Sequence, residues 1–347
     1  MKTTNLFHPN SNILNTVSKT LKTLLGTTLM ASLVLTSCSP NEEIDYVPAQ
    51  APERPTAQDF SNIRNQALDN ITQNFQFNAD DGFITLTSNH GVSISIDGNC
   101  LTKNGNAVTG MVDLEYVEIF EKGNMITTNK PTMGIMPNGD KALLLTGGEF
   151  FLEATQDGVA LETNCSMQLD VPTALTGGAD NAMILWYGNL DEDGNLAWEE
   201  AENDTGAEGQ NGVFTQNTTY YVMFDQFGWT NIDRFYNDPR PKTTINVSVP
   251  TGYNNLNSAI YLSYDGEESG LAQLDTYDPL TGKFSEHYGQ IPIGLECHLV
   301  FATEEDGNWR FAVKPVTIAE DGSTIFTLSE TSIATENELI LQINNLP

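Results

Sequence analysis

The chain is poor in basic residues. Of its 347 residues, 15 are Lys or Arg and 46 are Asp or Glu, a net charge of −31. Residues 1–37 hold three lysines and no acid, so their removal leaves a net charge of −34 (12 basic minus 46 acidic residues). A surface this negative repels phosphate backbones and anionic headgroups, which excludes nucleic-acid binding and peripheral phospholipid binding. Basic proteins, glycans and divalent cations are left as candidate partners.

The chain also lacks the motifs of several enzyme classes. It has no Gly-x-Ser-x-Gly elbow, no phosphate-binding Gly-Lys-Ser/Thr loop and no dinucleotide fingerprint. No two of its four histidines have the i, i+4 spacing of a zinc helix, and no cysteine pair has zinc-finger spacing. Among 46 acids, carboxylate pairs arise by chance and none stands out. We therefore expect no enzymatic activity, with a carboxylate-dependent hydrolase as an alternative.

Cysteine is scarce as well. Beyond Cys38, three cysteines remain, and an odd number argues against a disulfide framework. Cys165 and Cys297 alternate with apolar neighbours along predicted strands, which predicts that both are small buried hydrophobic side chains. A Cys100–Cys165 disulfide is the alternative, because spacing alone does not give the geometry that a disulfide needs.

The N-terminal segment has the features of a lipoprotein export signal. Three lysines precede an apolar run at 24–35, which is too short for a permanent membrane span. The sequence Leu35-Thr36-Ser37-Cys38 then matches the cleavage box of bacterial lipoproteins. Residues 1–37 are thus predicted to be the signal peptide, and Cys38 the site of diacylglycerol and palmitate attachment to the membrane. An ordinary secretory signal is the alternative.

Two connecting segments follow Cys38. Residues 38–55 form a tether with four prolines, and its acids resemble the export tag of surface-displayed lipoproteins in Bacteroidota-type bacteria. A plain soluble linker explains them equally well. Residues 56–76 are predicted to be an amphipathic helix, with Thr56 as N-cap and Asp59 in the first turn. Its apolar stripe is expected to pack on a core, although it could also dock another protein. The stripe consists of Phe60, Ile63, Ala67, Leu68, Ile71 and Phe75.

The rest of the chain predicts an all-β fold of two antiparallel β-sandwiches, at 77–238 and 242–347. Ten Asp-Gly or Asn-Gly pairs, which favour tight hairpin turns, separate runs with alternating apolar and polar residues. Pro239 and Pro241 interrupt this pattern and place the boundary between the domains. Seven strands are predicted in the last segment, among them residues 338–343.

Several stretches resemble known families. Residues 91–96, 108–114, 125–132 and 145–150 resemble the β-sandwich of ZU5-like extracellular modules. Residues 183–187, 196–200 and 227–235 are similar to segments of uncharacterised Bacteroidota-type outer-membrane lipoproteins. In those proteins a C-terminal sandwich similar to carboxypeptidase-regulatory or immunoglobulin-like modules often follows. The resemblance implies a surface-facing or periplasm-facing lipoprotein, and it brings no catalytic residues.

Two clusters are candidate binding sites. Trp229, Asn231, Asp233 and Arg234 precede the predicted boundary. They are interpreted as a structural corner, in which an acid holds Arg234 and Trp229 is buried, with ligand binding as the alternative. The second cluster, Asp191, Asp193 and Asn195, has oxygen ligands at alternating positions, like the first half of a calcium loop. The interpretation as a solvated hairpin turn is preferred, so calcium is a candidate cofactor only.

Together these features predict a lipid-anchored protein of the outer membrane that faces the cell surface or the periplasm. Its expected function is that of a non-catalytic binding, adhesion or structural module, with the ligand on loops of a rigid frame. Carbohydrate capture beside an uptake system is an alternative, which exposed aromatic side chains would favour. Burial of Trp198, Trp229 and Trp309 would count against it.

Overall fold

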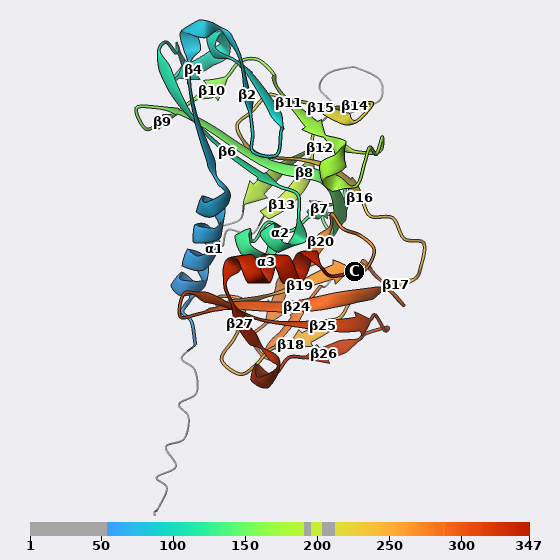
Figure 1. The fold of residues 1–347 in the computed structure, drawn as a ribbon. Coiled ribbons are helices and arrows are strands. Elements are labelled where there is room, and N and C mark those ends of the chain that lie inside the picture. The colour runs from blue at the N-terminus through green and yellow to red at the C-terminus, as the bar shows by residue number, and fades with distance from the viewer. Residues whose placement is uncertain (1–53, 191–195, 203–211, 287) are drawn as a thin grey trace, which may run out of the picture. The chain divides into compact units, whose positions relative to one another are not determined.

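The structure is a computed structural model that describes residues 54–190, 196–202, 212–286 and 288–347. These residues lie in one compact unit (Figure 1). Of the described residues, 49% lie in strands and 16% in helices, which confirms the predicted all-β class. Within the described ranges, no helix has both the length and the apolar character needed to cross a membrane.

The largest sheet has eight strands, in the order β1-β6-β8-β16-β12-β13-β7, with β9 paired to β8. β7 pairs with both β13 and β8, so strands β8, β16, β12, β13 and β7 form a closed ring of pairings. The strands are β1 (Gln73–Asn78), β6 (Met111–Ile119), β7 (Met133–Ile135), β8 (Lys141–Gln156), β9 (Val159–Ala160), β12 (Ile184–Leu190), β13 (Leu196–Glu200) and β16 (Gly228–Phe235).

A five-stranded antiparallel sheet packs on one face of this large sheet. Their apolar residues form a shared core, with Ile94, Leu169 and Val222 from the smaller sheet and Tyr116 and Phe150 from the larger one. Each large aliphatic side chain buried in this way stabilises the fold by about 1.5–3 kcal/mol. The smaller sheet consists of β14 (Val213–Gln216), β15 (Thr219–Phe224), β11 (Met167–Pro172), β3 (Ser93–Asp97) and β2 (Phe83–Thr87), and a third sheet of β10 (Glu162–Thr163), β4 (Leu101–Lys103) and β5 (Asn106–Ala107).

The C-terminal part forms a second sandwich, whose core includes Val247, Leu262 and Phe301 and also takes in Met133 of β7 and Leu143 of β8. One sheet has the order β20-β19-β24-β25-β27, the other β21-β22-β18-β26, and β17 pairs with β23. The strands are β17 (Lys242–Thr243), β18 (Asn246–Ser248), β19 (Ser258–Tyr264), β20 (Leu271–Gln273), β21 (Thr276–Asp278), β22 (Lys283–Ser285), β23 (Ile291–Pro292), β24 (Glu296–Glu305), β25 (Asn308–Thr317), β26 (Ser323–Ile325) and β27 (Ser332–Ala334).

Two helices, α2 (Lys122–Thr128) and α3 (Glu336–Asn344), lie between the large sheet and the C-terminal sandwich, and a third, α1 (Ala57–Ile71), runs along the side of both (Figure 1). A third apolar cluster joins Phe60 of α1, Met125 of α2 and Leu339 of α3 to Trp229 of β16 and Trp309 of β25. Because this cluster takes residues from both sides of 239–241, the predicted division into two domains at that point stays a prediction.

The predicted N-cap of α1 is confirmed. Thr56 and Asp59 form a capping box, in which each side chain bonds to the backbone of the other residue. The predicted end at residue 76 is wrong, because α1 stops at Ile71 and Phe75 lies in β1. Just before α1, Arg54 donates from Nε to the Thr251 carbonyl (3.0 Å), and Asn257 donates to the Pro55 carbonyl (3.1 Å). These bonds fix the start of α1 to the C-terminal sandwich.

The strand predicted at 338–343 is also wrong, since this segment lies in helix α3. Thr335 caps the helix in a capping box with Glu338, and Leu339 and Ile343 bury one face. Gly123 of α2 lies against α3, where a Cβ atom would be 2.7 Å from the Ile340 Cα. Close packing of this kind holds a short helix that would not be stable by itself.

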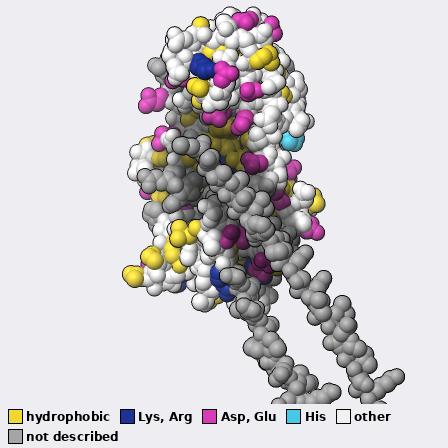
Figure 2. Space-filling view, turned by 90° about the vertical axis from the view of Figure 1, so that its left-hand side faces the viewer, with side chains coloured by type: hydrophobic (Ala, Val, Ile, Leu, Met, Phe, Trp, Pro, Cys, Tyr) yellow, Lys and Arg dark blue, Asp and Glu magenta, His cyan; other side chains and the backbone are white. Residues whose placement is uncertain are grey.

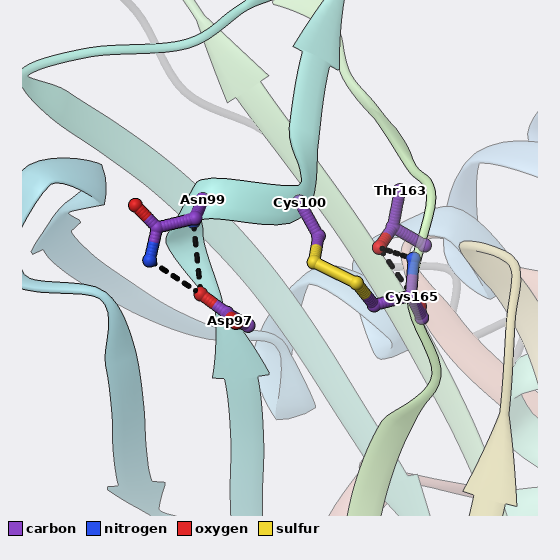
Figure 3. Close-up of a disulfide and its surroundings, with 5 residues drawn as sticks. All are labelled: Asp97, Asn99, Cys100, Thr163 and Cys165. Carbon is purple, nitrogen blue, oxygen red and sulfur yellow. Dashed lines mark hydrogen bonds between the residues drawn. A yellow bond between two sulfur atoms is a disulfide. The ribbon is translucent and has the colours of Figure 1, made fainter.

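Cys100 and Cys165 form a disulfide, so the argument from an odd cysteine count is wrong here (Figure 3). Asp97 accepts hydrogen bonds from both nitrogens of Asn99, which shapes the turn that leads to Cys100. On the other side, the Thr163 hydroxyl accepts from the Cys165 amide (3.2 Å). This turn interrupts the alternation predicted for residues 161–167 and leaves Cys165 exposed rather than buried. Cys297 is a buried free thiol, as predicted.

Tight turns close several hairpins at the predicted Asp-Gly and Asn-Gly pairs. Asp306 and Gly307 join β24 to β25 with φ angles of 50° and 77°, and Asn104 and Gly105 join β4 to β5 with 51° and 76°. Two successive positive φ angles are the requirement of the hairpin turn that these residue pairs favour.

Candidate functional site

A cavity of about 500 Å³ lies between α1, the end of α2 and the C-terminal sandwich. We call it the α1 pocket. Its lining comes from three separate parts of the chain: Gln58, Phe60, Ser61, Arg64 and Asn65 of α1; residues Thr128, Asn129 and Lys130; and Leu256, Ser258, Gln273, Asp275 and Phe284 of the C-terminal part. This volume is within the range of small-molecule sites in proteins.

Arg64 is held at the wall of the pocket by its neighbours. Its guanidinium carbon lies 3.8 Å from the ring centroid of Phe60, and Nη2 donates to the Tyr261 hydroxyl (3.4 Å). Its buried Nε has no hydrogen-bond partner among the residues that the structure describes. Burial lowers the pKa of Arg64, and Tyr261 acts in the opposite direction. The guanidinium keeps its charge, because arginine does not lose its proton in proteins.

Lys130 is placed by the end of α2. Asn129 ends this helix in the left-handed conformation (φ 56°), and its side-chain oxygen accepts from the Tyr261 hydroxyl (2.7 Å). The next side chain, Lys130, is buried, with Nζ 3.2 Å from the Thr128 carbonyl and 5.3 Å from the ring centroid of Trp229. Burial lowers the pKa of Lys130 to about 8. Lys130 therefore remains largely protonated at pH 7.

The opposite wall carries a carboxylate that already has partners. Asp275 lies 2.7 Å from the Lys141 ammonium and accepts from the Tyr288 hydroxyl (3.1 Å). Near it, burial raises the pKa of Glu286 to about 7, while hydrogen bonds from the backbone of residues 288–290 oppose that shift. The charge of Asp275 is thus balanced by Lys141.

Behind Lys130, a polar cluster is buried in the large sheet. Glu149 on β8 pairs with Asn231 on β16, and neither side chain is exposed. Asn231 donates to Asp233 (2.7 Å) and accepts from the Thr146 hydroxyl (2.6 Å). Both carboxyl oxygens of Glu149 lack a hydrogen-bond partner in the described structure. Burial raises the pKa of Glu149 and that of Asp233 well above their ordinary values, so both favour the neutral form.

No protein-family model matches the chain, and no curated protein was found to be similar to it.

The structure separates the residues of the first sequence-predicted cluster. Asn231 and Asp233 belong to the buried polar cluster, and Trp229 is buried next to Phe151 and Trp198. Arg234 instead forms an ion pair with Asp180 (2.5 Å). These positions correspond to the structural interpretation of the cluster. All four tryptophans of the chain are buried, so none of them offers an exposed ring to a sugar.

Asp191, Asp193 and Asn195, the candidate calcium ligands, lie outside the described residues. In the part of the chain that the structure describes, no three acidic, histidine or cysteine side chains are grouped to hold a metal. His287 also lies outside this part. His90 contacts Glu118 (2.7 Å) and His298 contacts Asp265 (2.7 Å), so each of these rings already has a carboxylate partner.

Exposed aromatic side chains occur on the outer face of the five-stranded sheet. Phe214 on β14 pairs with Tyr221 on β15, with ring centroids 6.4 Å apart. Met223 is 46% exposed on the same sheet, and Phe83 at its far edge is 71% exposed. Sequence analysis pointed to the tryptophans, but phenylalanine and tyrosine form this apolar surface.

Sequence analysis did not identify the α1 pocket. Arg64 lies on the predicted helix, yet its partners Lys130 and Tyr261 are far away in the sequence, so no local pattern joins them. The one available signal was an arginine beside the apolar stripe of a helix in a chain with few cations.

Proposed function

We propose that this chain is a lipid-anchored envelope protein of the outer membrane that binds a small polar molecule in the α1 pocket without chemical conversion. The anchor rests on the signal segment and Cys38, and the binding function on one observation. That observation is a 500 Å³ cavity whose walls carry charged, amide and hydroxyl side chains. The resemblance to Bacteroidota-type lipoproteins agrees with this location.

A pocket-filling variant tests the binding function. Ser61 is exposed on α1 and lines the pocket, so Ser61→Trp places an indole in the cavity. Gln66→Trp is the matched control, because Gln66 is exposed on the same helix but does not line the pocket. A metabolite library is screened by the shift in melting temperature of the mature protein. Ligands should stabilise the wild type and Gln66→Trp but not Ser61→Trp. Equal shifts in all three proteins would contradict the proposal.

A separate experiment tests the anchor. Cys38→Ala should abolish palmitate labelling and release the protein from the membrane fraction, because the thiol carries the lipid. Membrane attachment that persists in this variant would contradict the anchor. Protease treatment of intact and lysed cells then tells a surface-facing protein from a periplasm-facing one.

Carbohydrate binding on the outer face of the five-stranded sheet is a second candidate function. It is favoured by the exposed Phe214 ring and the partly buried Tyr221 ring beside it, since sugars stack on aromatic faces. If it is correct, Phe214→Ala should remove oligosaccharide binding while Ser61→Trp leaves it intact. The opposite result would assign the ligand to the α1 pocket.

A further inference from the structure

The α1 pocket concentrates positive charge in a strongly acidic protein. Figure 2 shows acidic side chains over the visible face and few basic ones, in agreement with the net charge of −31. The pocket nevertheless has both Arg64 and Lys130 in its lining. Neither takes part in an ion pair among the described residues, whereas the one acid of the lining, Asp275, is paired with Lys141. The pocket therefore has two positive charges that no acid of its lining balances.

Each of these cations has hydrogen-bonding capacity to spare. Arg64 is fixed by Phe60 and Tyr261, and of its five N–H donors only one, on Nη2, has a hydrogen bond to a side chain of the described residues, the Tyr261 hydroxyl. The Lys130 ammonium has three donors and is bonded to the Thr128 carbonyl. Both groups are held in place before a ligand arrives, which reduces the entropy that binding would cost.

The electrostatics favour an anion between these two groups. The pKa of Lys130 is lowered first by burial, and the positive charge of Arg64 lowers it further. Glu149 acts in the opposite direction, but burial raises its own pKa well above the ordinary value and favours its neutral form. Arg64 and Lys130 repel each other, and a bound oxyanion would relieve that repulsion.

We propose that the α1 pocket recognises a carboxylate or phosphate oxyanion of a small hydroxylated molecule, with Arg64 and Lys130 as the groups that bind the anion. Charge-assisted bonds from guanidinium and ammonium groups to oxyanions are among the strong hydrogen bonds of proteins. Ser61, Asn65 and Gln273 supply hydroxyl and amide groups for the rest of the ligand. Sugar acids and sugar phosphates have this chemistry. The inference rests on the proposed function of the same pocket.

Titration calorimetry with three probes tests this inference on the mature protein. Glucuronate and glucose 6-phosphate carry the two kinds of oxyanion, and glucose is the neutral comparison. At least one anionic probe should bind about tenfold more tightly than glucose, as one charge-assisted hydrogen bond predicts. The anionic probe that binds more tightly shows whether the pocket prefers a carboxylate or a phosphate. Equal affinity for all three probes, or binding by none, would overturn the inference.

Two kinds of variant then assign the binding to these residues. Lys130→Met should weaken the binding of the anionic probe about tenfold and leave the affinity for glucose unchanged. Since Lys130 is buried and its loss could disturb folding, Asn65→Asp is the second variant. It adds a negative charge at an exposed position of the pocket and should also weaken the binding of the anionic probe. Gln66→Glu adds the same charge to α1 away from the pocket and should not.

The outcomes separate this inference from the proposed function. Loss of ligand binding in Ser61→Trp together with unchanged binding in Asn65→Asp and Lys130→Met would keep the pocket as the binding site and overturn anion recognition. Unchanged binding in Ser61→Trp would instead overturn the proposed function.

Discussion

Glu149→Gln should make the protein more stable at neutral pH. The carboxyl of Glu149 is completely buried, and both of its oxygens lack a hydrogen-bond partner in the described structure. Burial raises its pKa well above the ordinary value, the neighbouring Asp233 carboxyl raises it further, and Lys130 opposes the shift. The folded protein therefore keeps this proton at pH values where the unfolded chain, with a glutamate pKa of about 4.3, has lost it.

The sign and size of the effect follow from this difference. A raised pKa in the folded state stabilises the protein in full below the pKa of the unfolded chain. That stabilisation is lost as pH rises toward the pKa of the folded state. Between these limits the free energy of unfolding falls by about 1.4 kcal/mol for each pH unit. Glutamine does not titrate, so the variant lacks this loss, and its advantage over the wild type should grow by about 1.4 kcal/mol for each pH unit between these limits.

Urea denaturation at pH 5, 6 and 7 measures the effect as the difference between the two proteins. Glu153→Gln is the matched control, because Glu153 lies on the same strand but is only partly buried. The difference between Glu149→Gln and the wild type should grow with pH, and that between the control and the wild type should not. Parallel curves for the wild type and Glu149→Gln would refute a neutral buried carboxyl at this position.

Three further predictions concern the fold. Replacing Cys100 and Cys165 together by Ser should lower the free energy of unfolding in urea by about 4 kcal/mol, as chain entropy predicts for cysteines 65 residues apart; an unchanged value would argue against the bridge. Leu339→Ala should cost about 2–5 kcal/mol, because the side chain is buried in α3, while Leu341→Ala at a 63% exposed position of the same helix should cost less than about 0.5 kcal/mol. Equal losses of thermal stability would contradict the helix orientation. Gly123→Ala should cost about 1–3 kcal/mol, since its Cβ would be 2.7 Å from the Ile340 Cα, and an unchanged melting temperature would contradict the contact of α2 with α3.

The start of α1 could be predicted from the sequence, and its end could not. Thr56 and Asp59 give a local capping signal, and the apolar residues that follow have helical spacing. Phe75 continues that spacing, but it also alternates with Phe77, which is buried in the first core. The sequence around Phe75 fits a helix and a strand equally well. Pairing of residues 73–78 with β6 makes this segment a strand.

The error at α3 has a different cause. Residues 338–343 are apolar enough for a buried strand, and neighbouring segments are strands. Thr335 and Glu338 form the same kind of capping box as Thr56 and Asp59, so a helix signal was present. The capping box decides the structure of this segment, and the regular spacing of the C-terminal strands does not extend to it.

The disulfide and the pocket are beyond local sequence patterns. Cys100 and Cys165 meet because two turns, at Asp97 and Thr163, bring their backbones together. Arg64, Lys130 and Tyr261 meet only because helices pack against two sheets. Patterns of three to four residues identify elements, whereas these sites depend on how distant elements pack.

The bonds of Arg54 and Asn257 have a mechanical consequence. If the chain is held by lipid at Cys38, a pull on that anchor that is carried along the backbone enters the described body at Arg54. There the load passes through the carbonyls of Thr251 and Pro55 into the C-terminal sandwich, before it reaches the first turn of α1. The Arg54 guanidinium also lies 4.7 Å from the ring centroid of Tyr253, which adds resistance at the same point. This attachment would shield α1 from tension, so that movement of the membrane would not distort the α1 pocket.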